Sequence, residues 1–381
     1  MAPHTARGFD GIGHLLIIGF DGLEISPRLG SLLRRLQPAG VILFARNIKN
    51  AEQTRQLLSD CQKCVATQLF TCVDLEGGTV DRFRDALGAA PSAGEVFSTG
   101  DRTLFRKHGE IIGANCRALG FNVDFAPVLD LAFEASRSVM GSRAVSADLR
   151  EVVTYAREFL AGLRAAKVMG CGKHFPGLGE GKLDSHHELP VIEKALKKLW
   201  AEDLVPYRTL RRQLPMVMVS HAAYPQVTHD RTPASLSKLW ITDVLRKRIG
   251  YRNLIVSDDL EMGGVLSAAP VGEAAVEFVR AGGDLCLICH REDYILQAAE
   301  ELIKTAERDS KFARRAAEAA RRVQAFKKKS ASMLNEGGSA RATRPLTSTM
   351  VEKLSRRLWE FGEQVRLDPF SRRADKRRAR S

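Results

Sequence analysis

Short runs of apolar and β-branched residues alternate with longer segments of helical periodicity along most of the chain. Eight such runs lie at residues 15–20, 41–44, 69–74, 122–130, 168–175, 216–222, 253–259 and 285–290. The segments that predict helices lie at residues 51–67, 101–119, 148–166, 192–212, 236–249, 273–281 and 293–327. Continuous apolar strands separated by helices are typical of a parallel sheet covered on both faces. Eight β/α units in this length predict a single (β/α)₈ barrel of the TIM type.

Polar residues support the barrel, because they fall at the carboxyl ends of seven of the eight predicted strands. These residues are Asp21, Arg46, Asn47, Asp74, Asp130, Lys173, His174, His221 and Asp258. A (β/α)₈ barrel carries its catalytic groups on this rim. A strand end also becomes polar simply because the chain reaches solvent. That would explain polar residues at one or two strand ends, but it explains seven less well.

The composition changes after residue 329. We expect residues 1–329 to form the catalytic barrel, residues 330–350 a linker rich in Gly, Ser, Ala and Arg, and residues 351–381 a basic tail. A short helix is expected at 351–364, with Leu354, Leu358 and Phe361 on one face. The tail is expected to be dispensable for chemistry.

The formal charge of +13 belongs mainly to this tail. Residues 327–381 hold 15 of the 58 Lys and Arg residues but only 6 of the 45 Asp and Glu residues, which leaves the barrel close to balance. Basic tails of this kind are usually solvated. Nucleic acid is therefore not expected as a partner, and the oligomeric state stays open.

The seven cysteines are scattered without a disulfide framework, and most have apolar neighbours. Buried thiols in a reducing cytoplasm are the expected state. No apolar run is long enough to span a bilayer, and the run at 15–20 lacks the features of a signal peptide. We therefore expect a cytoplasmic protein without a membrane span.

Three segments are dense in the groups that a sugar site needs. The first begins at Asp74 with D-L-E-G-G-T-V-D-R, and the second begins at Lys173 with K-H-F-P-G-L-G-E-G-K-L-D-S-H-H. The third, V-S-D-D-L-E-M, places two adjacent carboxylates, Asp258 and Asp259, at a strand end. Because side chains alternate along a strand, one of these two acids should face the barrel mouth and the other should pack sideways.

These segments resemble bacterial family 3 glycoside hydrolases of the β-N-acetylhexosaminidase type. Residues 173–190 are similar to the K-H-F-P-G-x-G-x-x-x-x-D-S-H-x-x-L-P signature, 257–262 to the S-D-D-L-x-M nucleophile segment, and 74–82 to the D-x-E-G-G-x-V-x-R segment. Residues 233–237 and 41–47 also fit the family pattern. The similarity runs in order over residues 12–328.

The resemblance implies roles position by position. Asp258 matches the nucleophile, His186 matches an unusual histidine acid/base, and Asp184 matches its carboxylate partner. The residues that match the binding site for a terminal N-acetylglucosamine are Asp74, Arg82, Arg143, Lys173 and His174. The implied substrate is carbohydrate: N-acetylglucosamine β-1,4-linked to an anhydro-muramic acid peptide, in cytoplasmic peptidoglycan recycling, or a chitooligosaccharide.

Elementary chemistry agrees with these roles. Retaining hydrolysis needs a nucleophilic carboxylate and a second group that acts first as acid and then as base. The histidine pKa of about 6.5 suits both the acid role and the base role near neutral pH. A carboxylate two residues away can orient the ring. The use of histidine in place of a second carboxylate comes from the family.

Two positions depart from the family pattern. Leu178 stands where the family usually has histidine, and Glu180 stands where aspartate is commoner. Leucine can neither donate nor accept a hydrogen bond. We expect the loop's order or its aglycone preference to change, with catalysis retained because His186 is present.

Neither a metal nor a cofactor is expected. His221 and His229 lack metal-binding spacing, and lone histidines at strand ends more often satisfy local hydrogen bonds. Asp259 is expected to be structural, with the role of nucleophile as its alternative.

Three rival functions remain. A β-glucosidase of the same superfamily takes its acid from a second domain, for which this chain is too short. A phosphorylase would release the sugar onto phosphate and is harder to exclude. A non-catalytic sugar-binding protein would be expected to lack Asp258 or His186, and both are present.

Overall fold

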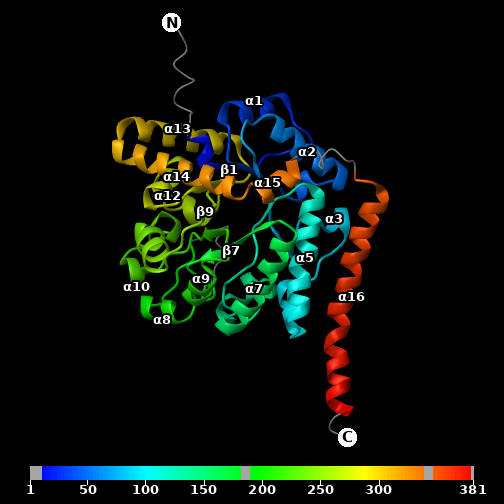
Figure 1. The fold of residues 1–381 in the computed structure, drawn as a ribbon. Coiled ribbons are helices and arrows are strands. Elements are labelled where there is room, and N and C mark those ends of the chain that lie inside the picture. Colours follow the sequence, from blue (N-terminus) through cyan, green and yellow to red (C-terminus); the bar gives the residue numbers. More distant parts are fainter. Residues whose placement is uncertain (1–10, 182–188, 339–345, 379–381) are drawn as a thin grey trace.

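The computed structural model describes residues 11–181, 189–338 and 346–378, and its centre is a closed barrel of eight parallel strands (Figure 1). Around the barrel the strand order is β1, β10, β9, β8, β7, β6, β3 and β2. The strands are β1 (Leu16–Ile18), β2 (Gly40–Ile42), β3 (Phe70–Val73), β6 (Val123–Asp124), β7 (Met169–Phe175), β8 (Met216–Val219), β9 (Leu254–Asp259) and β10 (Leu285–Ile288). Each lies within one of the eight apolar runs or overlaps it by all but one residue, so the predicted TIM-type barrel is confirmed.

A small antiparallel hairpin, β4 (Leu75–Gly77) and β5 (Val80–Asp81), follows β3 and was not predicted. Its turn explains the adjacent glycines of the first sugar-site segment. Gly77 has a φ of 80° and Gly78 a φ of 62°, in the left-handed region. A Cβ on Gly77 would also lie 2.1 Å from the carbonyl oxygen of Pro91. This turn therefore requires glycine.

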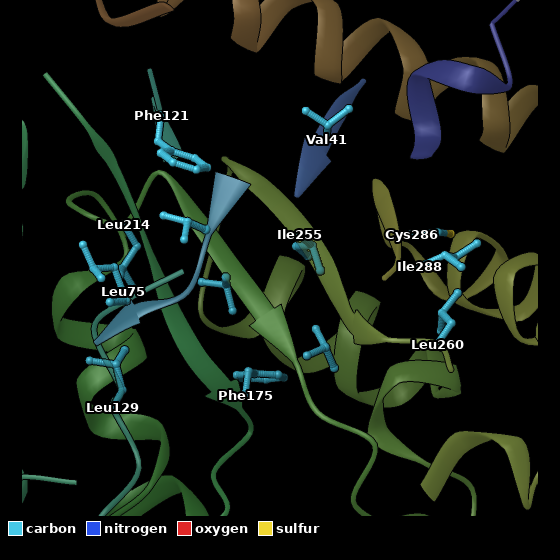
Figure 2. Close-up of a cluster of buried hydrophobic side chains, with 14 of the residues drawn as sticks. Val41, Leu75, Phe121, Leu129, Phe175, Leu214, Ile255, Leu260, Cys286 and Ile288 are labelled. Carbon is cyan, nitrogen blue, oxygen red and sulfur yellow. The ribbon is translucent and has the colours of Figure 1, made fainter. Parts of the chain in front are cut away.

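Side chains of the barrel strands alternate between two hydrophobic layers. Along β9, Leu254 and Val256 belong to the cluster inside the barrel, and Ile255 belongs to the layer between strands and helices. Figure 2 shows part of that outer layer, with Val41, Phe175 and Ile255 projecting from three strands. Both faces of the sheet are apolar, which is why each strand appears in the sequence as a continuous apolar run.

The helices cover the outside of the barrel (Figure 1). The α-helices that precede β8 are α1 (Pro27–Leu36), α2 (Ala51–Lys63), α3 (Arg84–Leu87), α4 (Ala93–Ser98), α5 (Arg102–Leu119), α6 (Arg137–Met140), α7 (Leu149–Ala165), α8 (Leu196–Ala201) and α9 (Leu204–Leu210). Those that follow β8 are α10 (Pro225–Thr228), α11 (Gly263–Leu266), α12 (Val271–Ala281), α13 (Glu292–Arg308), α14 (Ser310–Lys329), α15 (Ala331–Gly338) and α16 (Ser348–Arg378). A π-helix, η6 (Leu239–Arg248), and short 3₁₀ turns η1 (Gly13–Leu15), η2 (Ala45–Asn47), η3 (Glu134–Ser136), η4 (Gly141–Arg143) and η5 (Ala234–Leu236) complete the structure.

Two of the long predicted helices are interrupted. The segment 192–212 contains α8 and α9, and 293–327 contains α13 and α14. Asp309 ends α13 in an extended conformation, and its side chain accepts hydrogen bonds from the first amides of α14. An aspartate that caps a helix start is the local signal for this break.

The end of α14 and the start of α15 close the amino-terminal side of the barrel. Val323 and Leu334 are buried in the interior cluster, against which Phe326 also packs. Lys327 donates from Nζ to the carbonyl oxygen of Ala39 at 2.7 Å. Burial lowers the pKa of this lysine to about 7.

The C-terminal segment differs from expectation. Helix α15 occupies part of the predicted linker, and α16 is much longer than the predicted short helix. The apolar face that was predicted is the face that packs: Leu358 and Phe361 are buried, and α16 contacts α3, α4 and α5. Phe361 stacks on His108 with ring centroids 5.7 Å apart. The assignment of 330–350 as a linker and 351–381 as a tail dispensable for chemistry stays a prediction.

Phe361→Ala is expected to lower the free energy of unfolding by about 3–5 kcal/mol, because it opens a cavity at a fully buried site. Trp359→Ala is the matched control on the same helix, since Trp359 is 66% exposed, and it should change stability by less than about 0.5 kcal/mol. Urea denaturation of both variants measures the difference. Equally small effects would show that α16 is not docked in solution.

No helix among the described residues combines the length and the apolar character needed to cross a membrane.

Candidate active site

Charged residues at the ends of three barrel strands form the base of the site. Asp74 follows β3, Lys173 lies in β7 and Asp258 lies in β9. The Lys173 ammonium is 2.7 Å from Oδ1 of Asp74 and is almost fully buried. The structure therefore brings two of the predicted binding residues into direct contact across the top of the barrel.

Glu76 extends this contact into a buried ionic network. Its carboxylate lies 2.6 Å from Nζ of Lys173 and accepts two hydrogen bonds from Arg143, at 2.7 and 2.8 Å. Burial acts to raise the pKa of Glu76, but Lys173 and Arg143 outweigh it and hold the pKa well below its usual value. Arg143, which the sequence predicted as a sugar-binding residue, thus uses Nε and Nη2 to hold Glu76.

Asp130 holds the start of the second sugar-site segment. Its Oδ2 accepts from the backbone N–H of His174 at 3.1 Å and lies 2.7 Å from Nδ1 of the same residue. Its Oδ1 accepts from the N–H of Leu178 at 2.7 Å. An Nδ1 that faces a carboxylate acts as the donor, and Nε2 of His174 has no hydrogen-bond partner among the residues that the structure describes.

The hydrogen bond from the Leu178 N–H to Asp130 also bears on the departure from the family pattern, in which leucine replaces the usual histidine at position 178. The Leu178 side chain is buried in the core, so it needs no polar partner. The turn before it is fixed by a second bond, from the hydroxyl of Tyr224 to the carbonyl oxygen of Gly177 at 2.7 Å. The start of the segment is therefore anchored through its main chain and not through a side chain at position 178.

The adjacent acids Asp258 and Asp259 have different environments, as expected. Oδ1 of Asp258 accepts from the N–H of Asp259 at 2.9 Å, and no described residue hydrogen-bonds its Oδ2. Burial acts to raise the pKa of Asp258, but the rings of His174 and His221 outweigh it, so the pKa is lowered. The ammonium of Lys173 adds to this effect. Asp258 is therefore ionised at neutral pH, and one of its oxygens has no hydrogen-bond partner among the described residues.

Asp259 faces β10 instead. Its Oδ1 accepts from the N–H groups of Glu261, at 3.1 Å, and Cys289, at 3.3 Å. Its carbonyl oxygen lies 2.9 Å from Nε2 of His221, whose Nδ1 lies 2.7 Å from the hydroxyl of Ser235. Both ring nitrogens of His221 are occupied, and Asp259 ties β8, β9 and β10 together.

One group among the described residues brings three possible metal ligands within 4.8 Å of one another: Asp259, Glu261 and His290. Nδ1 of His290 lies 2.9 Å from Oε2 of Glu261 and 3.5 Å from Oδ2 of Asp259. The other oxygen of Glu261 accepts from the N–H of Arg291. Hydrogen bonding between His290 and Glu261 in the turn after β9 accounts for these contacts.

Arg82 directly follows β5, the second strand of the hairpin after β3. Its Nε is buried and has no hydrogen-bond partner among the described residues. Its guanidinium lies 5.5 Å from the ring centroid of Phe44. A buried donor without a partner is costly unless a ligand satisfies it, so Arg82 is well suited to bind a hydroxyl group.

The two residues predicted for acid/base chemistry, Asp184 and His186, lie outside the described residues. The described chain on either side, up to Gly181 and from Leu189, leaves from and returns to the β7–β8 side of the barrel.

Three residues of the site were not singled out as functional from the sequence: Glu76, Asp130 and His221. Glu76 lies inside the D-x-E-G-G segment, while Asp130 and His221 lie at predicted strand ends. Their positions on the rim were therefore visible in the sequence. Their hydrogen-bond and ion-pair partners were not, because these lie 14 to 97 residues away along the chain.

Comparisons with known proteins show which family the chain belongs to. The sequence profile of the glycosyl hydrolase family 3 N-terminal domain matches residues 10–325. A β-hexosaminidase of Bordetella avium is 38% identical over 295 residues, which cover 75% of this chain and 83% of that protein. The structure of a family 3 β-N-acetylglucosaminidase from Paenibacillus has a TM-score of 0.83 at 31% identity, covering 94% of this chain and 69% of that one.

A third relative has been solved with a sugar. The structure of NagZ from Neisseria gonorrhoeae in complex with N-trifluoroacetyl-D-glucosamine has a TM-score of 0.70 at 29% identity, covering 87% of this chain and 99% of that one. The predicted family resemblance is confirmed. This chain belongs to glycosyl hydrolase family 3 and is a glycoside hydrolase of the β-hexosaminidase type.

Proposed function

We propose that the protein is a retaining β-N-acetylglucosaminidase that removes terminal β-linked N-acetylglucosamine through a covalent intermediate on Asp258. The observation that carries the proposal is the state of Asp258: it is ionised and has an oxygen free of described partners. Its carboxylate also lies near His174 and Lys173 at the barrel mouth, and their charges lower its pKa. The relatives named for N-acetylglucosamine chemistry support the choice of sugar.

In the first step, a carboxylate oxygen of Asp258 attacks the anomeric carbon and the bond to the leaving oxygen breaks. His186 donates its proton to that oxygen, and Asp184 stabilises the ring. In the second step, the neutral His186 takes a proton from water, which attacks the anomeric carbon and releases Asp258 as a carboxylate. Two inversions retain the β configuration.

The side chains around Asp258 would hold the sugar. We assign hydroxyl recognition to Asp74, Arg82, Lys173 and His174, with Arg143 acting through Glu76. An array of charged donors and acceptors on one ring discriminates strongly against a sugar that lacks a matching group, because its own polar atoms would be left unpaired. We further propose a cytoplasmic protein whose substrate is a peptidoglycan-derived muropeptide ending in N-acetylglucosamine.

Hydrolysis of three aryl glycosides tests the proposal: the β-N-acetylglucosaminide, the β-N-acetylgalactosaminide and the β-glucoside. We expect kcat/KM for the first to exceed that for the glucoside by about 100-fold or more. Proton NMR should show β-N-acetylglucosamine as the first product, with or without added phosphate. The α anomer as first product, a preference for glucoside, or release of sugar 1-phosphate would contradict it.

A further inference from the structure

Lys194 is a buried cation surrounded by three acids. Its side chain is 1% exposed, and Nζ lies 2.5 Å from Oδ2 of Asp203, 2.7 Å from Oε2 of Glu202 and 3.3 Å from Oε1 of Glu180. The ammonium also lies 4.8 Å from the ring centroid of Phe133. Burial acts to lower the pKa of Lys194, but the hydrogen bonds to Asp203 and Glu202 outweigh it and raise the pKa. Lys194 is therefore permanently charged.

The acids around Lys194 come from two parts of the chain. Glu180 precedes the segment that carries Asp184 and His186, and Lys194 itself follows that segment. Asp203 and Glu202 lie between α8 and α9, on the barrel's outer layer. The ammonium thus joins the entry of the segment to its exit, and both to a helix pair of the scaffold.

Neighbouring contacts fix these anchor points. A Cβ on Gly177 would lie 2.8 Å from the Cβ of Asp203, so the side chain of Asp203 packs directly under the turn that opens the segment. At the exit, Ala223 donates to the carbonyl oxygen of Pro190 and accepts from the N–H of Ile192, at 2.8 and 2.9 Å. The chain at the exit is therefore already held against the residues that follow β8 before it reaches Lys194.

We infer that Lys194 is a positioning residue for the acid/base step, because its ammonium holds together the two ends of the segment that contains Asp184 and His186. The inference rests on the proposed function. A merely structural role predicts loss of stability with an equal loss of activity on every substrate. A positioning role predicts a loss that depends on how much acid assistance the leaving group needs.

Two variants separate these roles. Lys194→Met removes the charge and keeps much of the side-chain volume. Glu180→Gln removes the negative charge that faces Lys194, and also Lys198, at the entry of the segment. Its side chain is 29% exposed, so this variant serves as the test if Lys194→Met fails to fold. Lys194→Arg is the conservative variant, since a guanidinium can bridge several carboxylates. Lys198→Met is the matched control, because Lys198 lies 3.6 Å from the same Glu180 oxygen but is 59% exposed.

The measurement compares kcat/KM on an N-acetylglucosamine disaccharide and on the dinitrophenyl glycoside. For Lys194→Met we expect about a 30-fold loss on the disaccharide and less than about threefold on the dinitrophenyl glycoside. Glu180→Gln should lose about fivefold on the disaccharide alone, while Lys194→Arg and Lys198→Met stay within about threefold on both. Equal losses on the two substrates, or a loss for Lys198→Met that matches Lys194→Met, would overturn the inference.

A second readout separates this inference from the proposed function. If the unaltered protein cleaves neither substrate, the proposed function fails. Amide hydrogen exchange of peptides covering 176–181 and 189–193 then tests the anchoring: Lys194→Met should speed exchange there by about tenfold, with α5 and α7 unchanged. Unchanged exchange at both ends would overturn the role of Lys194 as an anchor.

Discussion

Asp258→Ala is expected to lower kcat on an aryl β-N-acetylglucosaminide by about 10⁴-fold or more, because the covalent route then has no nucleophile. The lowered pKa of Asp258 means that the carboxylate is already ionised in the unaltered protein. Removing it also takes away the charge that would stabilise the positive anomeric carbon in both transition states. Steady-state kinetics on the dinitrophenyl glycoside, which needs the least acid assistance, isolates this loss.

Asp259→Asn is the matched control for the neighbouring acid. Asparagine keeps an oxygen to accept from the N–H groups of Glu261 and Cys289, so the turn after β9 should persist. We expect less than about a tenfold loss for this variant. Added azide should restore turnover to Asp258→Ala and give the α-glycosyl azide, the product of a single inversion. Azide rescue of an Asp259 variant in place of Asp258→Ala would move the nucleophile to Asp259.

His186→Ala is expected to show the second-largest effect, and the size should depend on the leaving group. Hydrolysis of a disaccharide should fall by about 10²–10⁴-fold, which is the usual contribution of a general acid. Dinitrophenolate leaves without being protonated, so the first step on a dinitrophenyl glycoside should keep most of its rate. The second step still lacks the base that activates water, so a burst of phenol should precede the steady state. Stopped-flow absorbance measures this burst.

Asp184→Asn should give a milder form of the same pattern, because the imidazole stays but loses its anionic partner. Both variants should leave thermal unfolding nearly unchanged. Equal losses on the two substrates and no burst would remove His186 from the acid/base role. The search for the acid would then turn to the other carboxylates of the same segment, Glu180 and Glu188.

The barrel could be predicted from the sequence because all eight strands are buried on both faces. Such strands appear as short continuous apolar runs, and the helices between them keep a regular period. Helix breaks were harder to predict. No glycine marks the break between α8 and α9, and Pro206 lies after the break. The break between α13 and α14 depends on a single capping side chain, that of Asp309.

The length of α16 had no local signal either. The last buried apolar residue among its described side chains is Val365, while the helix itself continues to Arg378. Pro369 lies inside this helix, and a proline at such a position predicts an earlier end, so the sequence did not indicate the observed length.

The residues of the candidate site could be predicted from motifs, but the contacts between their side chains could not. Lys173 and Asp74 were each expected at a strand end, yet their contact depends on strands β3 and β7 closing into one barrel. Glu76 illustrates the same limit: its partner Arg143 lies 67 residues further along the chain. Lys194 resembles an ordinary surface lysine of a polar segment until Asp203 and Glu180 are placed around it.

Trapping the covalent intermediate tests the central claim most directly. The protein would be incubated with a fluorinated N-acetylglucosamine that has a good leaving group, and then digested with trypsin and analysed by mass spectrometry. We predict one label on the intact protein, located on the tryptic peptide 253–280 and, on fragmentation, on Asp258. A label on Asp259 or on another peptide, or continued turnover without any label, would contradict the proposed mechanism.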